Sequence, residues 1–282
     1  MSLSPGDRIA GELGGDDGRP VPDIVVEPDA DVLARAVAAA LAARLAAAQA
    51  VHGTASVVLT GGGVGTAVLR HVAGLAAEPA PGQDVDWSAV DVWWGDERFV
   101  PADDPERNEG GAREALLDPV GVPAERVHAM PASDAGFGTP EEAADWYAGQ
   151  LAAAAPEGRD LPRFDVLLLG MGPEGHVASI FPDSPAVRDE RPVVAVHDCP
   201  KPPPTRVSLG FPAITAAEEV WLIVSGEGKA EAVAGALGGA AREDLPAAGA
   251  RGRQATRWLL DAAAASRLPG PGGRVLPGAD GG

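Results

Sequence analysis

Two patterns of apolar residues alternate along the chain: helical spacing and short runs. Between residues 29 and 50 they fall at helical spacing, as Val32, Val37 and Leu41 illustrate, and this predicts a long amphipathic helix. Residues 56–60 are instead a short segment, Ser-Val-Val-Leu-Thr, with a continuous apolar centre, and this predicts a short buried strand.

These two patterns alternate as far as residue 265. The two ends of the chain are rich in glycine and proline instead. Further strands are predicted at 90–94, 164–169, 192–197 and 219–225, and further helices at 66–75, 141–154 and about 227–237, with 253–265 closing the fold. Continuous apolar strands alternating with helices favour a mostly parallel, Rossmann-like α/β sheet with helices on both faces. We expect one domain over residues 23–267, between disordered tails at 1–22 and 268–282.

Composition narrows the class of protein. The chain of 282 residues has no run of 18 apolar residues, no basic-then-apolar start and a single cysteine, which favours a soluble cytoplasmic protein. Its formal net charge of −19 argues against a nucleic-acid partner. An anionic small molecule would therefore need a local cationic pocket within this negative field. The chain has only two lysines, Lys201 and Lys229.

A glycine cluster follows the first predicted strand. Gly61, Gly62 and Gly63 stand between that strand and the next helix, where backbone amides and a helix N-terminus can meet an anion. A flexible tight turn is the alternative. No Gly-Lys-Ser/Thr follows, so the cluster is not a P-loop.

A charged stretch follows the strand at 90–94. It contains Asp96, Glu97 and Arg98. In parallel sheets, ligands bind beyond the carboxyl ends of the strands. Arg98 could hold a phosphate bidentately. The two acids could orient the side chain of Arg98 or bind hydroxyl groups. A solvated loop with a local ion pair is the alternative.

A histidine stands in a glycine-rich turn after the strand at 164–169. His176 lies two residues beyond Glu174, within Gly-Met-Gly-Pro-Glu-Gly-His. Histidine titrates near neutral pH and suits a general base.

Two cations flank a run of prolines. Lys201 and Arg206 enclose Pro202, Pro203 and Pro204, whose rigid backbone reduces the entropy lost on binding. An exposed polyproline-like linker is the alternative.

Taken in order, these segments resemble the 6-phosphogluconolactonase family over about residues 32–265. The matching stretches are Thr60–Gly63, Trp94–Arg98, Leu169–His176 and Lys201–Arg206. Gly63 and Glu174 depart from the family's commoner Ser and Asp, and the lysine and arginine are separated by one extra proline. The resemblance implies the α/β fold of this family. It also implies an activity, the hydrolysis of 6-phospho-D-glucono-1,5-lactone in the oxidative pentose phosphate pathway.

The same resemblance implies a relation to glucosamine-6-phosphate deaminases. Those enzymes carry Glu-Pro after the Gly-His stretch, for sugar ring opening, where this chain has Phe181-Pro182. Hydrolysis is therefore favoured. A deaminase/isomerase and a non-catalytic sugar-phosphate-binding protein are the alternatives.

The implied catalytic residues are His176, Glu174, Arg98 and Asp96. His176 would take a proton from water and Glu174 would orient its imidazole. Either Arg98 or glycine amides would meet the developing oxyanion. Gly61, Gly62, Gly63, Lys201 and Arg206 would hold the phosphate. No cofactor or metal is required, since no histidine and cysteine residues have zinc-ligand spacing.

Overall fold

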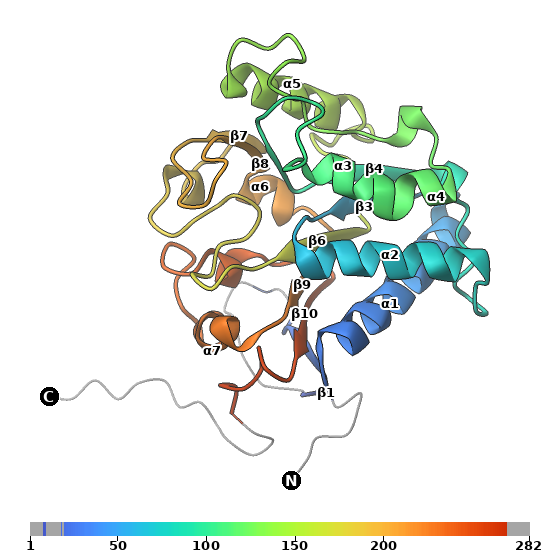
Figure 1. Ribbon diagram of the computed structural model, residues 1–282, viewed down its shortest axis with the longest axis vertical. Coiled ribbons are helices and arrows are strands. Elements are labelled where there is room, and N and C mark those ends of the chain that lie inside the picture. Colours follow the sequence, from blue (N-terminus) through green and yellow to red (C-terminus); the bar gives the residue numbers. More distant parts are fainter. Residues whose placement is uncertain (1–7, 10–17, 19, 270–282) are drawn as a thin grey trace, which may run out of the picture.

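A seven-stranded sheet forms the centre of the molecule (Figure 1). The computed structural model describes residues 8–9, 18 and 20–269, and within them the strand order is β1-β2-β10-β9-β6-β3-β4. All neighbours run parallel except β1 and β2. The strands are β1 (Arg8–Ile9), β2 (Asp23–Glu27), β3 (Ala55–Leu59), β4 (Val90–Trp94), β6 (Val166–Gly170), β9 (Glu219–Val224) and β10 (Ala255–Asp261).

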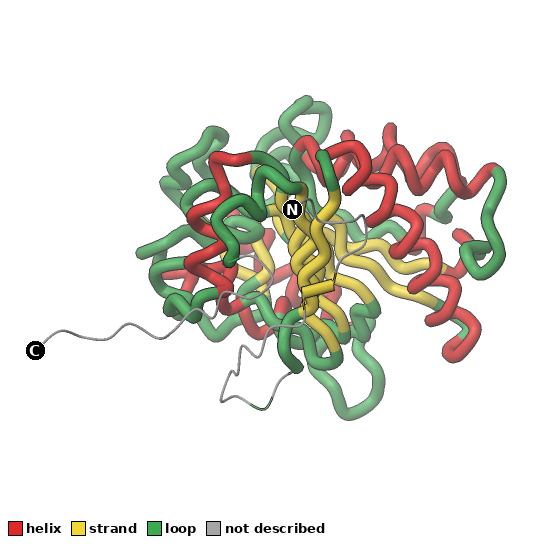
Figure 2. Tube along the Cα trace, turned by 90° about the horizontal axis from the view of Figure 1, so that it is seen from below, coloured by secondary structure: helices red, strands yellow, loops and turns green. Residues whose placement is uncertain are grey.

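The inner strands are mostly buried because both faces of the sheet are covered. Every residue of β3 and β9 is buried, and helices lie on both sides of the sheet (Figure 2). The two longest pack against each other. Helices are α1 (Ala30–His52), α2 (Gly63–Ala77), α3 (Asn108–Ala112), α4 (Asp118–Val120), α5 (Pro140–Ala153), α6 (Phe211–Ile214) and α7 (Ala230–Leu237), with a π-helical turn at Arg113–Leu117 and 3-10 turns at Trp87–Ala89, Ala124–Arg126, Pro185–Val187, Glu227–Lys229 and Pro246–Gly249.

Local chemistry sets the ends of α1. The Asp29 carboxylate accepts hydrogen bonds from the backbone N–H groups of Asp31 (3.0 Å) and Val32 (2.8 Å), which satisfies first-turn donors that have no partner within the helix. Gly53 ends the helix in the left-handed region at φ +77°, which costs glycine little.

A second, antiparallel sheet covers the carboxyl end of β4. Its order is β5 (Asp96–Arg98), β8 (Arg206–Leu209), β7 (Val193–Val196), and we call it the small sheet. Arg98 pairs with Arg206 across it. Neither β5 nor β8 was predicted from the sequence, and the solvated loop considered as the alternative for the Asp-Glu-Arg stretch is a strand. Charged and polar residues within both strands obscure the apolar pattern, and helices α5 and α6 pack against the small sheet.

The mostly parallel α/β sheet is confirmed, with shifted bounds. Helix α2 begins at Gly63, three residues earlier than predicted, so part of the glycine cluster is its first turn. Strand β2 was not predicted. Most of residues 1–22 and 268–282 lie outside the described residues, so the tails and the single-domain division stay predictions. No helix in the described ranges is long and apolar enough to cross a membrane.

Candidate active site

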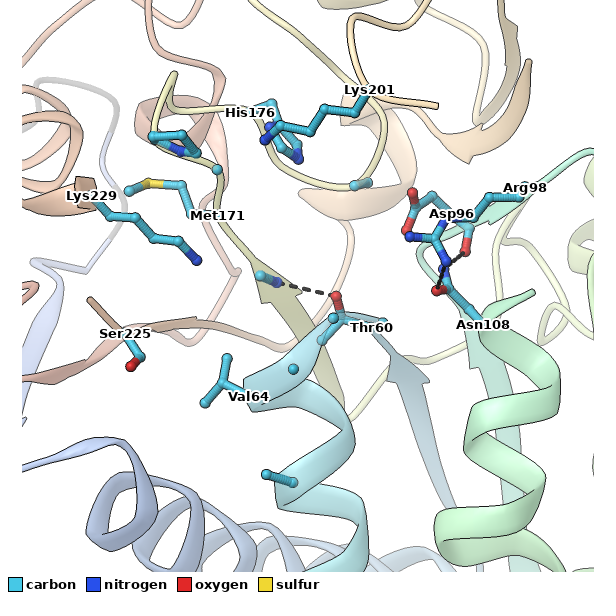
Figure 3. A pocket seen from close by; sticks show the side chains of 18 of the residues that line it. Thr60, Val64, Asp96, Arg98, Asn108, Met171, His176, Lys201, Ser225 and Lys229 are labelled. Atoms are coloured by element: carbon cyan, nitrogen blue, oxygen red, sulfur yellow. Dashed lines mark hydrogen bonds between the residues drawn. The ribbon is translucent and has the colours of Figure 1, made fainter. Parts of the chain in front are cut away.

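A cleft of about 670 Å³ opens where β3, β4 and β6 end (Figure 3). The carboxyl ends of parallel strands meet at one edge of a sheet, so motifs far apart in sequence come together there. Eight of the nine predicted site residues line it, and Glu174 contacts one of them, His176. The eight are Gly61, Gly62, Gly63, Asp96, Arg98, His176, Lys201 and Arg206.

The turn after β6 presents His176 to the cleft. Its Nδ1 lies 3.0 Å from Oε1 of Glu174. An ionised carboxylate only accepts hydrogen bonds, so Nδ1 carries the hydrogen and Nε2 has a free lone pair. A Cβ atom at Gly172 would lie 2.2 Å from Nδ1 and 2.6 Å from Oε2 of Glu174. Glycine is needed at 172 to make room for this pair.

Burial disfavours the protonated form of His176. Desolvation lowers its pKa below the ordinary value and outweighs the opposing charge of Glu174, while the charge of Lys201 lowers the pKa further. Phe181 contributes to this desolvation, because its ring stacks on the imidazole with centroids 4.2 Å apart. A neutral imidazole near pH 7 is the form that can accept a proton.

Lys201 joins the same group. Its Nζ lies 2.9 Å from Oε1 and 3.1 Å from Oε2 of Glu174. Burial alone would raise the pKa of Glu174, but a backbone hydrogen bond and the hydrogen bond from Lys201 hold it below its usual value. The Lys201 side chain is 45% exposed, so the ammonium is open to an incoming anion.

Arg98 forms the opposite wall of the cleft. Its Nη1 donates to the side-chain oxygen of Asn108 (2.8 Å) and to the backbone carbonyl of Glu106. We had expected Asp96 and Glu97 to orient the guanidinium, and the structure corrects this. The Glu97 carboxylate accepts from the backbone N–H of Arg98 and not from its guanidinium. At 1% exposure Glu97 is also too buried to bind a substrate hydroxyl.

Asp96 belongs to a buried polar network that supports the cleft wall. Its Oδ2 accepts from the Ser179 hydroxyl (2.6 Å) and lies 3.7 Å from Nη1 of Arg206. Arg206 donates in turn to the carbonyls of Lys201 and Pro203, both at 3.0 Å. Arg206 therefore holds the proline loop in place, with its side chain only 6% exposed.

The glycine turn faces these groups from the floor of the cleft. Gly62 precedes α2 and no side chain caps the helix, so first-turn N–H groups remain available to an anion. The Thr60 hydroxyl accepts from the backbone N–H of Gly170 (3.1 Å) and ties this turn to the one that carries His176.

Lys229 is the cation that the sequence reasoning missed. It follows β9 and points into the cleft (Figure 3). Burial lowers its pKa, and the charge of Lys201 lowers it further. The rule that site residues follow strand ends would have found it in Gly-Glu-Gly-Lys. Both lysines of the chain thus line one cleft.

No group of three or more His, Cys, Asp or Glu side chains suited to a metal ion occurs in the described part of the chain. The chemistry that the cleft offers is that of an oriented base, fixed cations and unpaired backbone amides.

Comparison with known proteins places the chain among similar sequences. The family described as glucosamine-6-phosphate isomerases/6-phosphogluconolactonase matches residues 28–258. A 6-phosphogluconolactonase of Streptomyces coelicolor is 56% identical over 252 residues, which cover 88% of this chain and 95% of that protein.

Solved structures of similar fold include members of the same family. The fold is similar to that of 6-phosphogluconolactonase from Trypanosoma brucei, with a TM-score of 0.73, 28% identity, and coverage of 88% of this chain and 99% of that one. It is also similar to a monomeric glucosamine-6-phosphate deaminase, with a TM-score of 0.70, 20% identity, and coverage of 86% and 98%. That second likeness shows the fold alone.

Proposed function

This chain belongs to the glucosamine-6-phosphate isomerase/6-phosphogluconolactonase family, and we propose that it is a hydrolase that converts 6-phospho-D-glucono-1,5-lactone into 6-phosphogluconate in the pentose phosphate pathway. The observation that carries the proposal is the pair of His176 and Glu174 at the cleft, with Nε2 of the imidazole unpaired among described residues and with both lysines nearby. An oriented neutral base beside cations suits hydrolysis of an anionic ester.

His176 removes a proton from water. The water oxygen forms a bond to the lactone carbonyl carbon and Nε2 takes the proton. The tetrahedral intermediate then expels the ring oxygen, which receives a proton from the imidazolium as the ring C–O bond breaks. Glu174 holds the imidazole ring of His176 through the Nδ1–H group and stabilises the positive charge that forms on that ring. A base positioned in this way typically contributes ~10²–10⁴-fold.

Negative charge develops on the carbonyl oxygen during the attack. Arg98 faces the cleft with a guanidinium fixed by Asn108 and the Glu106 carbonyl, so it can meet that charge without reorganising. Backbone amides of the glycine turn are the other candidates, and the test of Arg98 below separates them.

The phosphate is held at the other side of the cleft. Free N–H groups at the start of α2, in Gly62 and Gly63, favour a dianion there, and Lys229 supplies a charge. Lys201 is exposed enough to contact the phosphate as well, but it would then give up its ion pair with Glu174. Arg206 acts through the loop that carries Lys201.

Ring-opening deamination of an amino-sugar phosphate is the alternative within the family. Phe181 argues against it, because an apolar ring stacks on His176 where the resemblance to deaminases calls for a carboxylate. A protein that binds sugar phosphates without turnover is the alternative from another class.

One assay separates the three. Freshly made 6-phosphogluconolactone is followed with and without the protein, corrected for spontaneous hydrolysis. Accelerated loss supports the proposal. Ammonia release from glucosamine 6-phosphate would favour the deaminase, and tight binding of 6-phosphogluconate without turnover would favour the binding protein. We further propose a cytoplasmic location, in keeping with the single cysteine. We also propose that the protein has no nucleic-acid partner, because its net charge of −19 repels a phosphate backbone.

A further inference from the structure

The only asparagine of the chain sits beside the cleft, at the start of α3. Its Oδ1 accepts the hydrogen bond from Arg98 (2.8 Å), and its Nδ2 donates to the backbone carbonyl of Asp96 (2.9 Å). Both ends of the amide are therefore used, so the amide cannot turn over without losing both contacts. Asn108 is 9% exposed.

The same side chain packs on the glycine turn. A Cβ atom at Gly61 would lie 2.0 Å from Oδ1 of Asn108 and 2.6 Å from its Cγ, and no side chain can approach so closely. Asn108 thus explains the glycine at 61 and joins three parts of the cleft: the small sheet, the glycine turn and α3.

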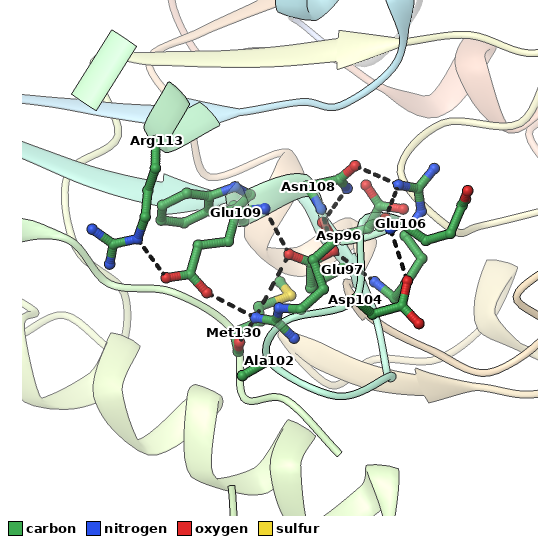
Figure 4. Close-up of polar contacts among 12 residues, drawn as sticks. Asp96, Glu97, Ala102, Asp104, Glu106, Asn108, Glu109, Arg113 and Met130 are labelled. Atoms are coloured by element: carbon green, nitrogen blue, oxygen red, sulfur yellow. Dashed lines mark hydrogen bonds and ion pairs between the residues drawn. The ribbon is translucent and has the colours of Figure 1, made fainter. Parts of the chain in front are cut away.

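Glu97 fixes Asn108 from below (Figure 4). Its buried carboxylate accepts from the backbone N–H groups of Asn108 (2.7 Å) and Glu109 (2.9 Å), so it caps α3 from a neighbouring strand. Nη2 of Arg107 lies 3.7 Å away and offsets part of the cost of burying the charge. Burial nevertheless raises the pKa of Glu97.

We infer that Asn108 is a positioning residue, which aims the guanidinium of Arg98 into the cleft and is itself held by Glu97. Asn108 is the only side chain in the described ranges that forms a hydrogen bond with the Arg98 guanidinium, whose other bond goes to a backbone carbonyl and whose Nε is buried without a partner. Without the amide oxygen, the long side chain regains other rotamers. Asp96 and Glu97, which precede Arg98 in the chain, form no hydrogen bond with its guanidinium and do not replace this contact.

The inference rests on the proposed lactonase activity and is tested by a double-mutant cycle. Asn108→Ala should lower kcat/KM by about 10–100-fold, the scale of a displacement of about 1 Å, with the same split between kcat and KM as Arg98→Ala. The double variant should be no slower than Arg98→Ala alone, because Asn108 acts through Arg98. Additive losses, or a different split, would overturn the inference.

Glu114→Ala is the control. Glu114 is exposed in the turn that follows α3 and should leave kcat/KM unchanged. If Asn108→Ala does not fold, Asn108→Ser takes its place in the cycle, since serine is too short to reach both partners. Absence of turnover in the wild-type protein would count against the proposed function, and it would be seen before any variant is made.

A second readout does not depend on activity. Gly61→Ala should lower the melting temperature because its methyl group meets the amide of Asn108. Adding Asn108→Ala should restore part of that loss, since the smaller side chain leaves room. A Gly61→Ala variant as stable as wild type, or one that is not rescued, would show that the close packing of these residues does not hold in solution.

Discussion

Lys201 and His176 share one carboxylate oxygen: Oε1 of Glu174 lies 2.9 Å from Nζ of the lysine and 3.0 Å from Nδ1 of the histidine. The lysine thereby enters the electrostatics of the base. Its positive charge and the negative charge of Glu174 act on the imidazole in opposite directions.

The first prediction concerns the pH dependence of kcat/KM. Because the neutral imidazole is the active form, the rate falls as pH drops through the pKa of His176. Burial lowers that pKa, so the acid limb should lie below 6.5, the ordinary value. Lys201→Met removes a charge that lowers the pKa, so the limb should move to higher pH. Glu174→Gln removes one that raises it, so the limb should move to lower pH. Shifts of the same sign in both variants would contradict the shared-carboxylate arrangement.

The second prediction concerns the base itself. His176→Ala should lower turnover by at least ~10²-fold, with an unchanged circular dichroism spectrum. His197→Ala is the matched control, because His197 is exposed and pairs with Glu141 on the surface. A folded His176→Ala variant with near-normal turnover would remove this histidine from the mechanism.

The third prediction concerns the phosphate. Lys229→Met should mainly raise KM, since a lost charge-assisted contact costs about 1.5–3 kcal/mol. Inorganic phosphate should compete with the lactone in the wild type and compete less well in this variant. Equal turnover of a lactone without phosphate would show that Lys229 has another role.

The fourth prediction concerns Arg98. Arg98→Lys keeps the charge and loses the planar fork. If the guanidinium meets the oxyanion, its contribution exists only in the transition state, so kcat should fall more than apparent affinity. An unchanged kcat with a raised KM would instead place Arg98 at the phosphate. No change in either constant would leave the Asp-Glu-Arg stretch without a catalytic part.

The fifth prediction concerns Arg206. Arg206→Ala removes hydrogen bonds to two carbonyls of the proline loop and leaves Asp96 without its nearby cation. The free energy of unfolding in urea should fall by about 1–3 kcal/mol. Unchanged stability with a raised KM would favour direct phosphate contact by Arg206.

The periodicity of apolar residues was sufficient to predict most of the fold. The run at 219–225 is buried on both faces, so it reads as a strand without knowledge of its neighbours. Strand β5 could not be found in this way. Asp96, Glu97 and Arg98 are paired with β8, which lies more than a hundred residues away.

In the site, a contact between side chains could be predicted only where both residues belong to the same motif. His176 and Glu174 stand two residues apart, and the turn between them fixes their contact. The support of Arg98 was assigned wrongly, to Asp96 and Glu97, the two acids that precede it in the chain. Adjacent side chains of a strand point to opposite faces, which turns Glu97 away from the Arg98 guanidinium. The carboxylate of Asp96, on the same face as Arg98, is engaged by Ser179 and Arg206. The partner of Arg98 therefore comes from another element, as Asn108.

The register of the small sheet has a consequence for insertions and deletions. Asp96 and Arg98 face the cleft while Glu97 faces α3, and the pairing of Arg98 with Arg206 fixes that alternation. One added or lost residue within 96–98 would exchange the two faces of β5, burying the arginine and turning the capping carboxylate toward an anionic substrate. One within 206–209 would exchange the faces of β8 and shift its pairing with β5. Length changes in homologous chains should therefore fall in the exposed segment at 101–106, between β5 and α3, and be absent from the two strands.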